Sequence, residues 1–491
     1  MRGFMIAAPA SGSGKTALAC GLMELLKERG IPLAAFKCGP DYIDPMFHRQ
    51  VVGVDSLNLD SFFLEPQALR ELFAQTGGER LCLVEGAMGY FDGMGADSSW
   101  ASSWEISRIL GIPVVLVVDA KGASLSLLAQ IKGFLDYVPA GTAGEKSRIV
   151  GVILNRCSPG LGERLKERLE GELGIRLLGC VPALDWLKIE SRHLGLKLPG
   201  EIEGLKAQLR RLAGELEQRL DVEGILELSR RWETPMEGLG RLEQWKRQTG
   251  QGREKGGRGD GMPDCGPFAL GIAMDRAFCF YYRENLRMLE KEGARLIRFS
   301  PLADLELPPG IQGLYLGGGY PELWARELAE NEAMRRAVCR AAQAGMPILA
   351  ECGGYLYLLE RLQGEDGRLY PMAGVLKGEG RREKRLRHFG YIGLEALEDL
   401  PYLKKGAWVR GHEFHYWHCA EDESRSLGLA HKPSGKGSWP ALRAEGGVMA
   451  GFPHLYYPSY PELPRAFGAA CRRWGREAGE GKTCLRKTEG I

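Results

Sequence analysis

The sequence predicts an α/β fold of two domains, each built on a parallel sheet, with a flexible linker between them. Short apolar runs alternate with helical patterns over residues 1–232, and runs that are apolar on both faces are typical of parallel strands covered by helices. Residues 233–267 are polar and glycine-rich, as linkers are. Strand patterns begin again at residue 268, so we expect a second domain over 268–475 and a frayed tail over 476–491.

The composition is that of an ordinary globular protein, with 44% hydrophobic and 26% charged residues among 491. The net charge is +2, from 65 basic and 63 acidic side chains, and gives no overall field that favours nucleic acid or an anionic membrane. The chain begins directly with a strand pattern and contains no apolar run near the ~20 residues of a membrane span, so we expect a cytoplasmic protein. None of the 12 cysteines forms a C-x-x-C pair, and we expect most of them to be reduced and buried.

The first motif is a glycine-rich turn between a strand pattern at residues 4–7 and a helix pattern at 16–29. Its sequence, A-P-A-S-G-S-G-K-T over residues 8–16, is typical of a loop that binds a nucleoside triphosphate at a helix N-terminus. Pro9 stands where the general motif has its first glycine. A glycine-rich turn that binds nothing is the alternative interpretation.

Four residues of this turn are assigned to the nucleotide. The glycines let backbone N–H groups converge on phosphate oxygens, the lysine reaches the β- and γ-phosphates, and the threonine hydroxyl can ligate Mg²⁺. These residues are Gly12, Gly14, Lys15 and Thr16. We therefore expect ATP and Mg²⁺ as cofactors.

Polar side chains follow the other strand patterns of this half, at residues 33–36, 81–85, 113–118 and 150–154. Ligands of parallel sheets gather at the carboxyl ends of the strands, so we expect Mg²⁺ ligands and groups that orient the substrate among these side chains. The expected metal ligands are Thr16, Asp41 and Glu85, and the expected orienting groups are Lys37, Asp44 and Asp92. A capping or turn-forming role is the alternative for each single aspartate.

Residues farther along the first domain provide additional candidates. Asn155 follows the strand pattern at 150–154, where its amide could read an adenine edge, and an ordinary loop role is the alternative. Arg192 and His193 stand in the mixed sequence S-R-H-L-G-L over 191–196, where they could meet an acidic substrate. A buried, hydrogen-bonded histidine is the alternative at residue 193.

The second domain contains its own sharp turn, E-C-G-G over residues 351–354, between a strand pattern at 346–350 and a helix pattern at 355–361. A cysteine on such a turn is typical of a nucleophile, and we expect the helix N-terminus to lower the pKa of the Cys352 thiol. Backbone N–H groups of nearby glycines would hold an oxyanion. The candidate donors are Gly353 and, after the strand pattern at 313–316, Gly318 and Gly319. A buried structural cysteine at a tight turn is the alternative.

A thiol nucleophile needs a base, and His454 is the candidate because it lies late in the chain after a short apolar run, as in Cys–His hydrolases. His412 and His415 are its rivals, and we interpret them, with Glu413, as structural or orienting groups. A metal site made from these three is disfavoured because adjacent residues of a strand point to opposite faces.

The two motifs together predict one reaction. A Cys–His pair that attacks an amide releases ammonia, and an ATP-binding domain with carboxylates can activate an acid as an acyl phosphate. Ammonia that attacks the acyl phosphate then forms an amide.

Further motifs follow the phosphate loop in order. They are K-x-G-P-D-Y-I-D at 37–44, E-G-x-M-G-x-x-D-G at 85–93, R-H-L-G-L at 192–196, Y-x-E-N-L at 282–286, G-G-G-Y-P-E at 317–322, A-E-C-G-G at 350–354 and G-H-E-F-H at 411–415. Together they resemble the family of cobyrinic acid a,c-diamide synthases, and only the linker and the tail lie outside the match.

The resemblance implies a glutamine- and ATP-dependent ligase that amidates the a- and c-acetate carboxylates of cobyrinic acid, or of a related tetrapyrrole, in cobalamin biosynthesis. It implies a dethiobiotin-synthetase-like phosphate-loop domain followed by a domain like the class I glutamine amidotransferases. Cys352 would be the glutaminase nucleophile, and His454 would raise its nucleophilicity. The residues that would serve Mg·ATP and the substrate are Asp41, Asp44, Glu85 and Asp92.

Two positions depart from the family pattern. Ala8 stands in place of a glycine that is common in related phosphate loops, although Gly14-Lys15-Thr16 is intact. Tyr456 stands two residues after His454, where the family often has a second histidine and ordinary class I amidotransferases have a glutamate. We therefore expect an incomplete triad and slow glutamine hydrolysis, and the group that orients the His454 ring is left open.

Other functions stay open at this point. Nickel-sirohydrochlorin a,c-diamide synthases are similar to this family and act on a different tetrapyrrole, and cobyric acid synthases form a third group. In a different class, the first domain would be an ATP-switched partitioning-type protein and the second a degenerate partner-binding module, which predicts nucleotide-dependent dimerisation without glutaminase activity. For the ligase we expect glutamine and the tetrapyrrole as partners, neither nucleic acid nor membrane, and leave a homodimer open.

Overall fold

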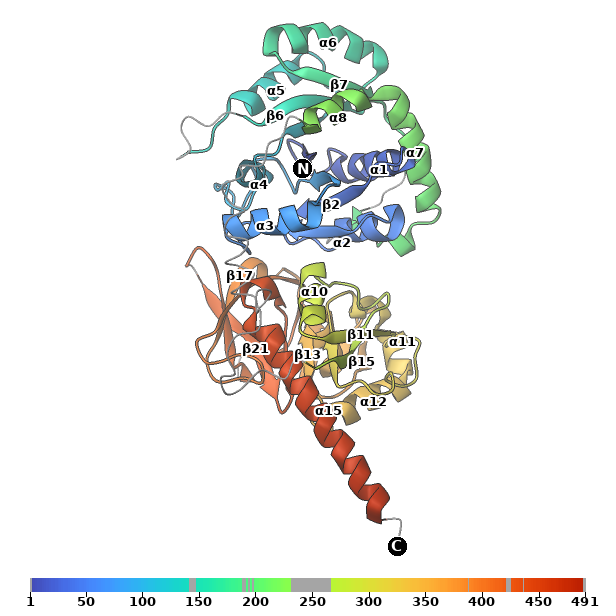
Figure 1. Ribbon diagram of the computed structural model, residues 1–491, viewed down its shortest axis with the longest axis vertical. Coiled ribbons are helices and arrows are strands. Elements are labelled where there is room, and N and C mark those ends of the chain that lie inside the picture. Colours follow the sequence, from blue (N-terminus) through green and yellow to red (C-terminus); the bar gives the residue numbers. More distant parts are fainter. Residues whose placement is uncertain are drawn as a thin grey trace, which may run out of the picture. The chain divides into compact units, whose positions relative to one another are not determined.

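The computed structural model describes residues 2–140, 147–187, 191–192, 195–196, 198–230, 266–386, 388–420, 425–435 and 437–488. The chain divides into two units, 1–256 and 257–491, and each contains both helices and strands (Figure 1). The predicted linker at 233–267 lies outside the described residues except for its last two, and the domain limits predicted at 232, 267 and 475 stay predictions. None of the described helices is long and apolar enough to cross a membrane.

Seven strands form the sheet of the first unit, in the order β3-β2-β4-β1-β5-β6-β7, and all neighbours run parallel. The strands are β1 Arg2–Ala7, β2 Leu33–Cys38, β3 Ser56–Leu59, β4 Leu81–Glu85, β5 Val114–Asp119, β6 Ile149–Asn155 and β7 Arg176–Val181. Every residue of β2 and β4 is buried, as in a parallel sheet that is covered on both faces. The parallel sheet predicted for this half of the chain is confirmed.

Helices follow most of these strands. They are α1 Lys15–Glu28, α2 Ile43–Met46, α3 Pro66–Gly77, α4 Ser103–Leu110, α5 Ser126–Asp136, α6 Pro159–Leu173, α7 Leu205–Arg219 and α8 Val222–Arg230, with a π-helical turn η1 Phe47–Val52 and the short strands β8 Ser191–Arg192 and β9 Gly195–Leu196. α4 begins where the Ser102 hydroxyl accepts a hydrogen bond from the Glu105 N–H (3.2 Å), and α3 and α6 begin with a proline in the first turn. Both features are typical helix starts.

The sequence does not predict β3 or β7. β3 has only four residues and alternates polar with apolar side chains, and β7 contains Gly179 with a φ of 143°. Neither forms the continuous apolar run that marks the other strands, and pairing with a neighbouring strand decides their structure.

Ten strands form the main sheet of the second unit, in the order β11-β10-β12-β13-β22-β21-β20-β17-β18-β23. Neighbours run parallel from β11 to β22 and antiparallel from β22 to β23. The strands are β10 Phe268–Ala273, β11 Ala294–Phe299, β12 Gly313–Leu316, β13 Ile348–Glu351, β17 His388–Ala396, β18 Trp408–His415, β20 Gly428–His431, β21 Ser438–Glu445, β22 Val448–Gly451 and β23 His454–Leu455. A smaller sheet contains β14 Leu359–Gln363, β15 Leu369–Pro371, β16 Leu376–Arg382 and β19 Trp417–His418.

Successive residues of the central strands point into two apolar clusters on opposite faces of this sheet. Leu316 and Ala350 pack in one cluster, and Tyr315 and Leu349 pack in the other. The helices of this unit are α10 Arg283–Lys291, α11 Ala325–Glu330, α12 Glu332–Gln343, α13 Gly353–Leu358 and α15 Glu462–Thr488. The α/β fold predicted for this half is confirmed.

One prediction for this unit was wrong. The helix expected over 355–361 ends at Leu358, because Leu359 has an extended backbone and begins β14, which pairs with β15 and β16. The tail expected over 476–491 stays a prediction, and α15 extends to Thr488. The first turns of α15 are anchored in the apolar core, and the charged sequence that follows contains no proline to end the helix.

The cysteines behave as predicted from their spacing. The ten whose side chains the structure describes are all free, and most of them are buried. They pack as small apolar side chains.

Gly21 allows α1 to pack closely against α7. A Cβ at Gly21 would lie 2.8 Å from side-chain atoms of Leu212 and Leu216, whereas a Cβ at Gly214, on the exposed side of α7, would meet no atom of the described chain within 4 Å. We expect Gly21→Ala to lower the free energy of unfolding by about 1–3 kcal/mol and Gly214→Ala to raise it by about 0.5–1 kcal/mol. Urea unfolding of the two variants measures both changes, and equal effects would contradict the packing described.

Candidate functional site

The phosphate loop turns into α1 through two glycines with a left-handed backbone, Gly12 (φ 77°) and Gly14 (φ 92°). Asn155, at the end of β6, donates a hydrogen bond from Nδ2 to the Ser13 carbonyl (2.9 Å). A Cβ at Gly14 would lie 2.3 Å from the same nitrogen, so the loop and β6 can approach this closely only with glycine at residue 14. The Asn155 amide thus holds the phosphate loop against β6, and the reading of an adenine edge by Asn155 stays a prediction.

The Lys15 ammonium lies between the phosphate loop and the loop after β4. Its Nζ donates hydrogen bonds to the carbonyls of Met88 (2.5 Å) and Ala10 (3.2 Å). Burial, and then the neighbouring Lys37, lower the pKa of Lys15 to about 8. Lys15 is therefore still mostly cationic at pH 7, with its charge directed at carbonyl dipoles from both loops.

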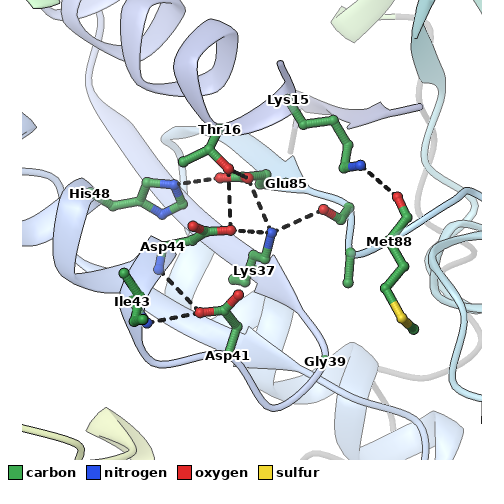
Figure 2. A network of polar contacts seen from close by, with 12 residues as sticks. Lys15, Thr16, Lys37, Gly39, Asp41, Ile43, Asp44, His48, Glu85 and Met88 are labelled. Atoms are coloured by element: carbon green, nitrogen blue, oxygen red, sulfur yellow. Dashed lines mark hydrogen bonds and ion pairs between the residues drawn. The ribbon is translucent and has the colours of Figure 1, made fainter. Parts of the chain in front are cut away.

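A buried cluster of polar side chains lies beside this loop (Figure 2). The Thr16 hydroxyl donates to Glu85 Oε1 (2.6 Å) and lies 3.3 Å from Asp44 Oδ2. Lys37 Nζ lies 2.5 Å from Asp44 Oδ2 and 3.0 Å from Glu85 Oε1, and it donates to the Gly86 carbonyl (3.0 Å). These groups meet because Lys37 and Glu85 are register partners on the parallel strands β2 and β4.

The structure groups the acidic residues differently from the expectation, which put Thr16 with Asp41 and Glu85. Asp41 Oδ1 accepts hydrogen bonds from the backbone N–H groups of Ile43 (2.8 Å) and Asp44 (3.1 Å) and so turns the chain into α2. Asp44 is the aspartate whose carboxylate reaches the Thr16 hydroxyl (Figure 2).

The other candidates of the first unit have separate positions. Asp92 Oδ2 accepts a hydrogen bond from the Gly89 N–H (2.9 Å) and closes the turn after β4. Arg192 is the second residue of the short strand β8. His193 lies outside the described residues.

Burial and mutual contact set the charges of the cluster. Burial alone would lower the pKa of Lys37, but the Asp44 and Glu85 carboxylates raise it well above its usual value. Burial alone would raise the pKa of Glu85, yet Lys37 and His48 hold it well below its usual range. Burial, Asp41 and Glu85 together raise the pKa of Asp44. Lys37 and Glu85 therefore stay ionised at neutral pH, and Asp44 takes a proton more readily than Glu85 does.

His48 is a member of the cluster that the sequence does not single out. Its Nε2 lies 2.9 Å from Glu85 Oε2, and its Nδ1 lies 2.9 Å from Ser56 Oγ. The ring is fully buried in the π-helical turn η1, where neither helical nor strand periodicity gives the direction of a side chain. Its one sequence signal is its closeness to the motif at 37–44.

The oxygen atoms of the cluster fit a magnesium ion. Thr16, Asp44 and Glu85 offer one hydroxyl and two carboxylates, and proteins hold Mg²⁺ through one or two carboxylates together with substrate phosphates. Within the described part of the chain, no three or more His, Cys, Asp or Glu side chains form a ready-made metal cage.

The second centre is built around Cys352, which connects β13 to α13 with a positive φ of 48°. This backbone conformation is strained for a residue with a side chain. The Cys352 N–H donates to the Gly451 carbonyl (2.8 Å) at the end of β22. A Cβ at Gly354 would lie 2.1 Å from a backbone oxygen of β12, and one at Gly353 would lie 3.0 Å from the Gly319 nitrogen, so the turn needs both glycines.

His454 begins β23 and lies against Gly318. A Cβ at Gly318 would lie 2.2 Å from the Cε1 atom of the His454 ring, so the imidazole occupies the space that a side chain there would need. The Gly318 backbone forms a β-bridge with Phe280, in which its N–H donates to the Phe280 carbonyl (3.3 Å) and its carbonyl accepts from the Phe280 N–H (3.0 Å). The Gly318 N–H, expected to serve an oxyanion, is thus already engaged. The other expected donors are Gly319 and Gly353.

The Cys352 thiol is less acidic than the sequence predicts. Burial raises its pKa above the usual value, and the Glu322 and Glu413 carboxylates raise it further, while a hydrogen bond from the Gly353 N–H acts in the opposite direction. α13 has only six residues, and its dipole does not outweigh the loss of hydration. The expected lowering of this pKa was wrong, and the centre holds a thiol at neutral pH.

His454 is neutral at the same pH. Burial, and then His412 and His415, lower the pKa of His454 to about 3. His412 is its register partner across strands β18 and β23, and burial and Lys432 lower the pKa of His412 to about 3 as well. A neutral imidazole can accept a proton from a thiol, which a cationic one cannot.

Glu413 and His415 form a buried pair on β18, near enough to act electrostatically on Cys352 and His454. His415 Nε2 lies 2.7 Å from Glu413 Oε1, and Trp439 Nε1 donates to both Glu413 oxygens (3.1 Å each). The His415 ring also stacks on Phe452, with centroids 3.8 Å apart. His412 precedes Glu413 and points to the opposite face of the strand, so these residues do not converge on one metal.

Two family models match the chain. The CobQ/CobB/MinD/ParA nucleotide binding domain matches residues 4–196, and the CobB/CobQ-like glutamine amidotransferase domain matches residues 269–459. The phosphate loop with its polar cluster lies in the first range, and Cys352 and His454 lie in the second.

Several relatives match almost the whole chain. The cobyrinate a,c-diamide synthase of Caldanaerobacter subterraneus subsp. tengcongensis is 36% identical, over 97% of this chain and 100% of that protein. Those of Listeria innocua and Salmonella typhimurium are each 36% identical over 96% of this chain, and over 100% and 98% of their own length. The prediction of a glutamine-hydrolysing ligase is confirmed by these matches. The chain belongs to the family of cobyrinate a,c-diamide synthases.

Proposed function

We propose that this protein amidates the a- and c-acetate carboxylates of cobyrinic acid, or of a closely related tetrapyrrole, with ammonia from glutamine and energy from ATP. The observation that carries the proposal is the presence of two different centres on one chain. One contains the Cys352 thiol and the neutral His454 imidazole, with the His454 ring against Gly318 and the turn after Cys352 against Gly319. The other sets Thr16, Asp44 and Glu85 beside a phosphate loop. The names of the relatives supply the substrate.

In the second unit, Cys352 and His454 release ammonia from glutamine. As the Cys352 sulfur bonds to the amide carbon, its proton passes to the neutral His454 imidazole, and the carbonyl oxygen takes the negative charge. The N–H groups of Gly319 and Gly353 are the proposed donors to that oxygen. His454 then gives the proton to the leaving nitrogen, ammonia departs, and water hydrolyses the thioester to glutamate and the free thiol.

In the first unit, the phosphate loop holds ATP with its phosphates at the N-terminus of α1. Thr16, Asp44 and Glu85 would hold Mg²⁺, which neutralises part of the phosphate charge when bound. Lys15 adds positive charge at the γ-phosphate once it leaves the Met88 carbonyl. A substrate carboxylate displaces ADP from this phosphate to form an acyl phosphate, and ammonia then displaces phosphate from the acyl carbon to form the amide.

The two half-reactions should be separable by mutation. Cys352→Ala removes the nucleophile, so we expect glutamine-dependent amidation to fall by about 10³-fold or more, while amidation from added ammonium salt stays near the original rate. Product mass and ADP release measure both. Cys339→Ala, at a half-buried cysteine of α12, is the matched control and should leave both activities unchanged. Loss of both activities in Cys352→Ala at unchanged folding would contradict the division of labour.

The Thr16 hydroxyl should matter for the ATP reaction alone. Thr16→Val keeps the shape of the side chain but removes the group that bonds to Glu85 and Asp44, and we expect both ammonia- and glutamine-dependent amidation to fall by about 10²-fold. Glutamine hydrolysis measured without ATP should be unchanged. Thr16→Ser retains the hydroxyl and should keep most of the amidation activity. A Thr16→Val enzyme as active as Thr16→Ser would rule out a role for the hydroxyl.

The raised pKa of the Cys352 thiol predicts slow alkylation in the absence of glutamine. Only the thiolate reacts with iodoacetamide, so labelling of Cys352 at pH 7 should be slower than that of Cys339 and should still be rising at pH 9. Mass spectrometry of peptides after timed labelling provides both rates. Rapid labelling of Cys352 that reaches a plateau below pH 7 would show a preformed thiolate instead.

A further inference from the structure

The segment that follows His454 is held by two buried polar side chains that the chemistry above does not use. Tyr456 stands two residues after the base, where ordinary class I amidotransferases have a glutamate, and its ring packs edge-on against Tyr282 (centroids 5.4 Å). On one side the His454 ring is confined by Gly318, where a Cβ would lie 2.2 Å away. The backbone that follows His454 also helps to set the position from which the ring extends.

Asn285, in α10, bonds to this backbone in two places. Its Nδ2 donates to the Leu455 carbonyl (2.7 Å), and its Oδ1 accepts from the Tyr457 N–H (2.8 Å). The side chain is fully buried. A carboxamide carries a donor and an acceptor side by side, so one asparagine fixes both ends of the 455–457 segment.

Glu351 bonds to the same segment from the end of β13. Its Oε1 accepts from the Leu455 N–H (3.3 Å) and from the Tyr457 hydroxyl (3.3 Å), and its Oε2 accepts from the Tyr315 hydroxyl (2.9 Å). Glu351 directly precedes Cys352 in the chain. A single residue thus connects the turn of the nucleophile with the strand of its base.

Burying the Glu351 carboxyl group costs free energy, because the group is removed from water. Glu351 is 3% exposed, and the groups it contacts, Tyr315, Leu455 and Tyr457, all belong to one apolar cluster. Burial raises the pKa of Glu351 to about 8, although the hydrogen bonds from these three residues act to lower it. An apolar side chain of similar size would pack here without the cost of removing a carboxyl group from water. Packing alone therefore does not account for a glutamate.

We propose that Glu351 and Asn285 are positioning residues that hold the backbone of residues 455–457, and through it the His454 ring, in the orientation toward Cys352 that proton transfer needs. They take the place of the third acid that this chain lacks after its base. The inference rests on the proposed function, because it takes Cys352 and His454 as the reacting pair.

The test compares glutamine hydrolysis by the full-length protein and its variants. Glu351→Leu and Asn285→Ala should each lower kcat by about 10²-fold, as misplacement of a reacting group by ~1 Å does, with KM for glutamine changed by less than about twofold. Glu351→Gln should recover most of kcat, because its Oε1 can still accept from Leu455 and Tyr457. Ammonia-dependent amidation, which uses the other unit, should be unchanged in all three.

The matched control is Asn331→Ala. Asn331 Nδ2 donates to the carbonyls of Pro301 (2.9 Å) and Asp304 (2.8 Å) in the same unit, so its loss loosens this unit without touching the 455–457 segment. Its kcat should equal that of the unmodified protein. His454→Ala is measured in parallel and should be inactive in glutamine hydrolysis.

The outcomes separate this inference from the proposed function. Unchanged kcat in Glu351→Leu and Asn285→Ala, with His454→Ala inactive, would overturn the positioning role alone. An active His454→Ala would overturn the choice of base. A Glu351→Gln variant as impaired as Glu351→Leu, or an equal loss in Asn331→Ala, would also overturn the inference, because it would indicate general loosening.

If circular dichroism shows that Glu351→Leu is unfolded, Asn285→Asp tests the positioning role in its place. This change keeps the acceptor for the Tyr457 N–H and removes the donor to the Leu455 carbonyl. We expect kcat for glutamine hydrolysis to fall by about tenfold at unchanged KM. An unchanged kcat in Asn285→Asp would overturn the inference.

Discussion

Both centres depend on one constraint, the meeting of strand ends at the carboxyl edge of a parallel sheet. Neighbouring strands lie about 4.8 Å apart, so residues distant in sequence meet there. Lys37 and Glu85, 48 positions apart, are register partners on β2 and β4. Glu351 and Gly451 are register partners on β13 and β22, and this pairing seats the turn at Cys352 beside the chain that leads into β23.

The two centres differ in buried charge: the first contains ionised side chains, and in the second the thiol and the imidazole are neutral. In the first unit, Lys37 and Glu85 are both ionised and compensate each other, so the environment for phosphates and a metal ion is polar before any ligand arrives. In the second unit, burial keeps Cys352 and His454 neutral. In the proposed mechanism, charge arises there only when a proton moves between them, so the folded protein does not bear the free-energy cost of a buried thiolate.

The strand–turn–helix motifs around Lys15 and Cys352 could be predicted from sequence, because glycine spacing and flanking apolar runs reflect local backbone geometry. Contacts between distant segments could not. Asp41 and Asp44 are three residues apart, and only the turn into α2 decides which carboxylate reaches Thr16. The pKa of the Cys352 thiol is raised by burial and by carboxylates from other elements. A local sequence pattern contains no information about either.

Position 318 in the second centre is unusually sensitive to substitution. Every residue type other than glycine carries a Cβ, and at this position that atom would lie 2.2 Å from the His454 ring. Even alanine, usually the mildest substitution for glycine, would therefore clash with the ring, because its Cβ occupies the same position as the Cβ of tryptophan. Any substitution at residue 318 therefore requires the His454 ring to move.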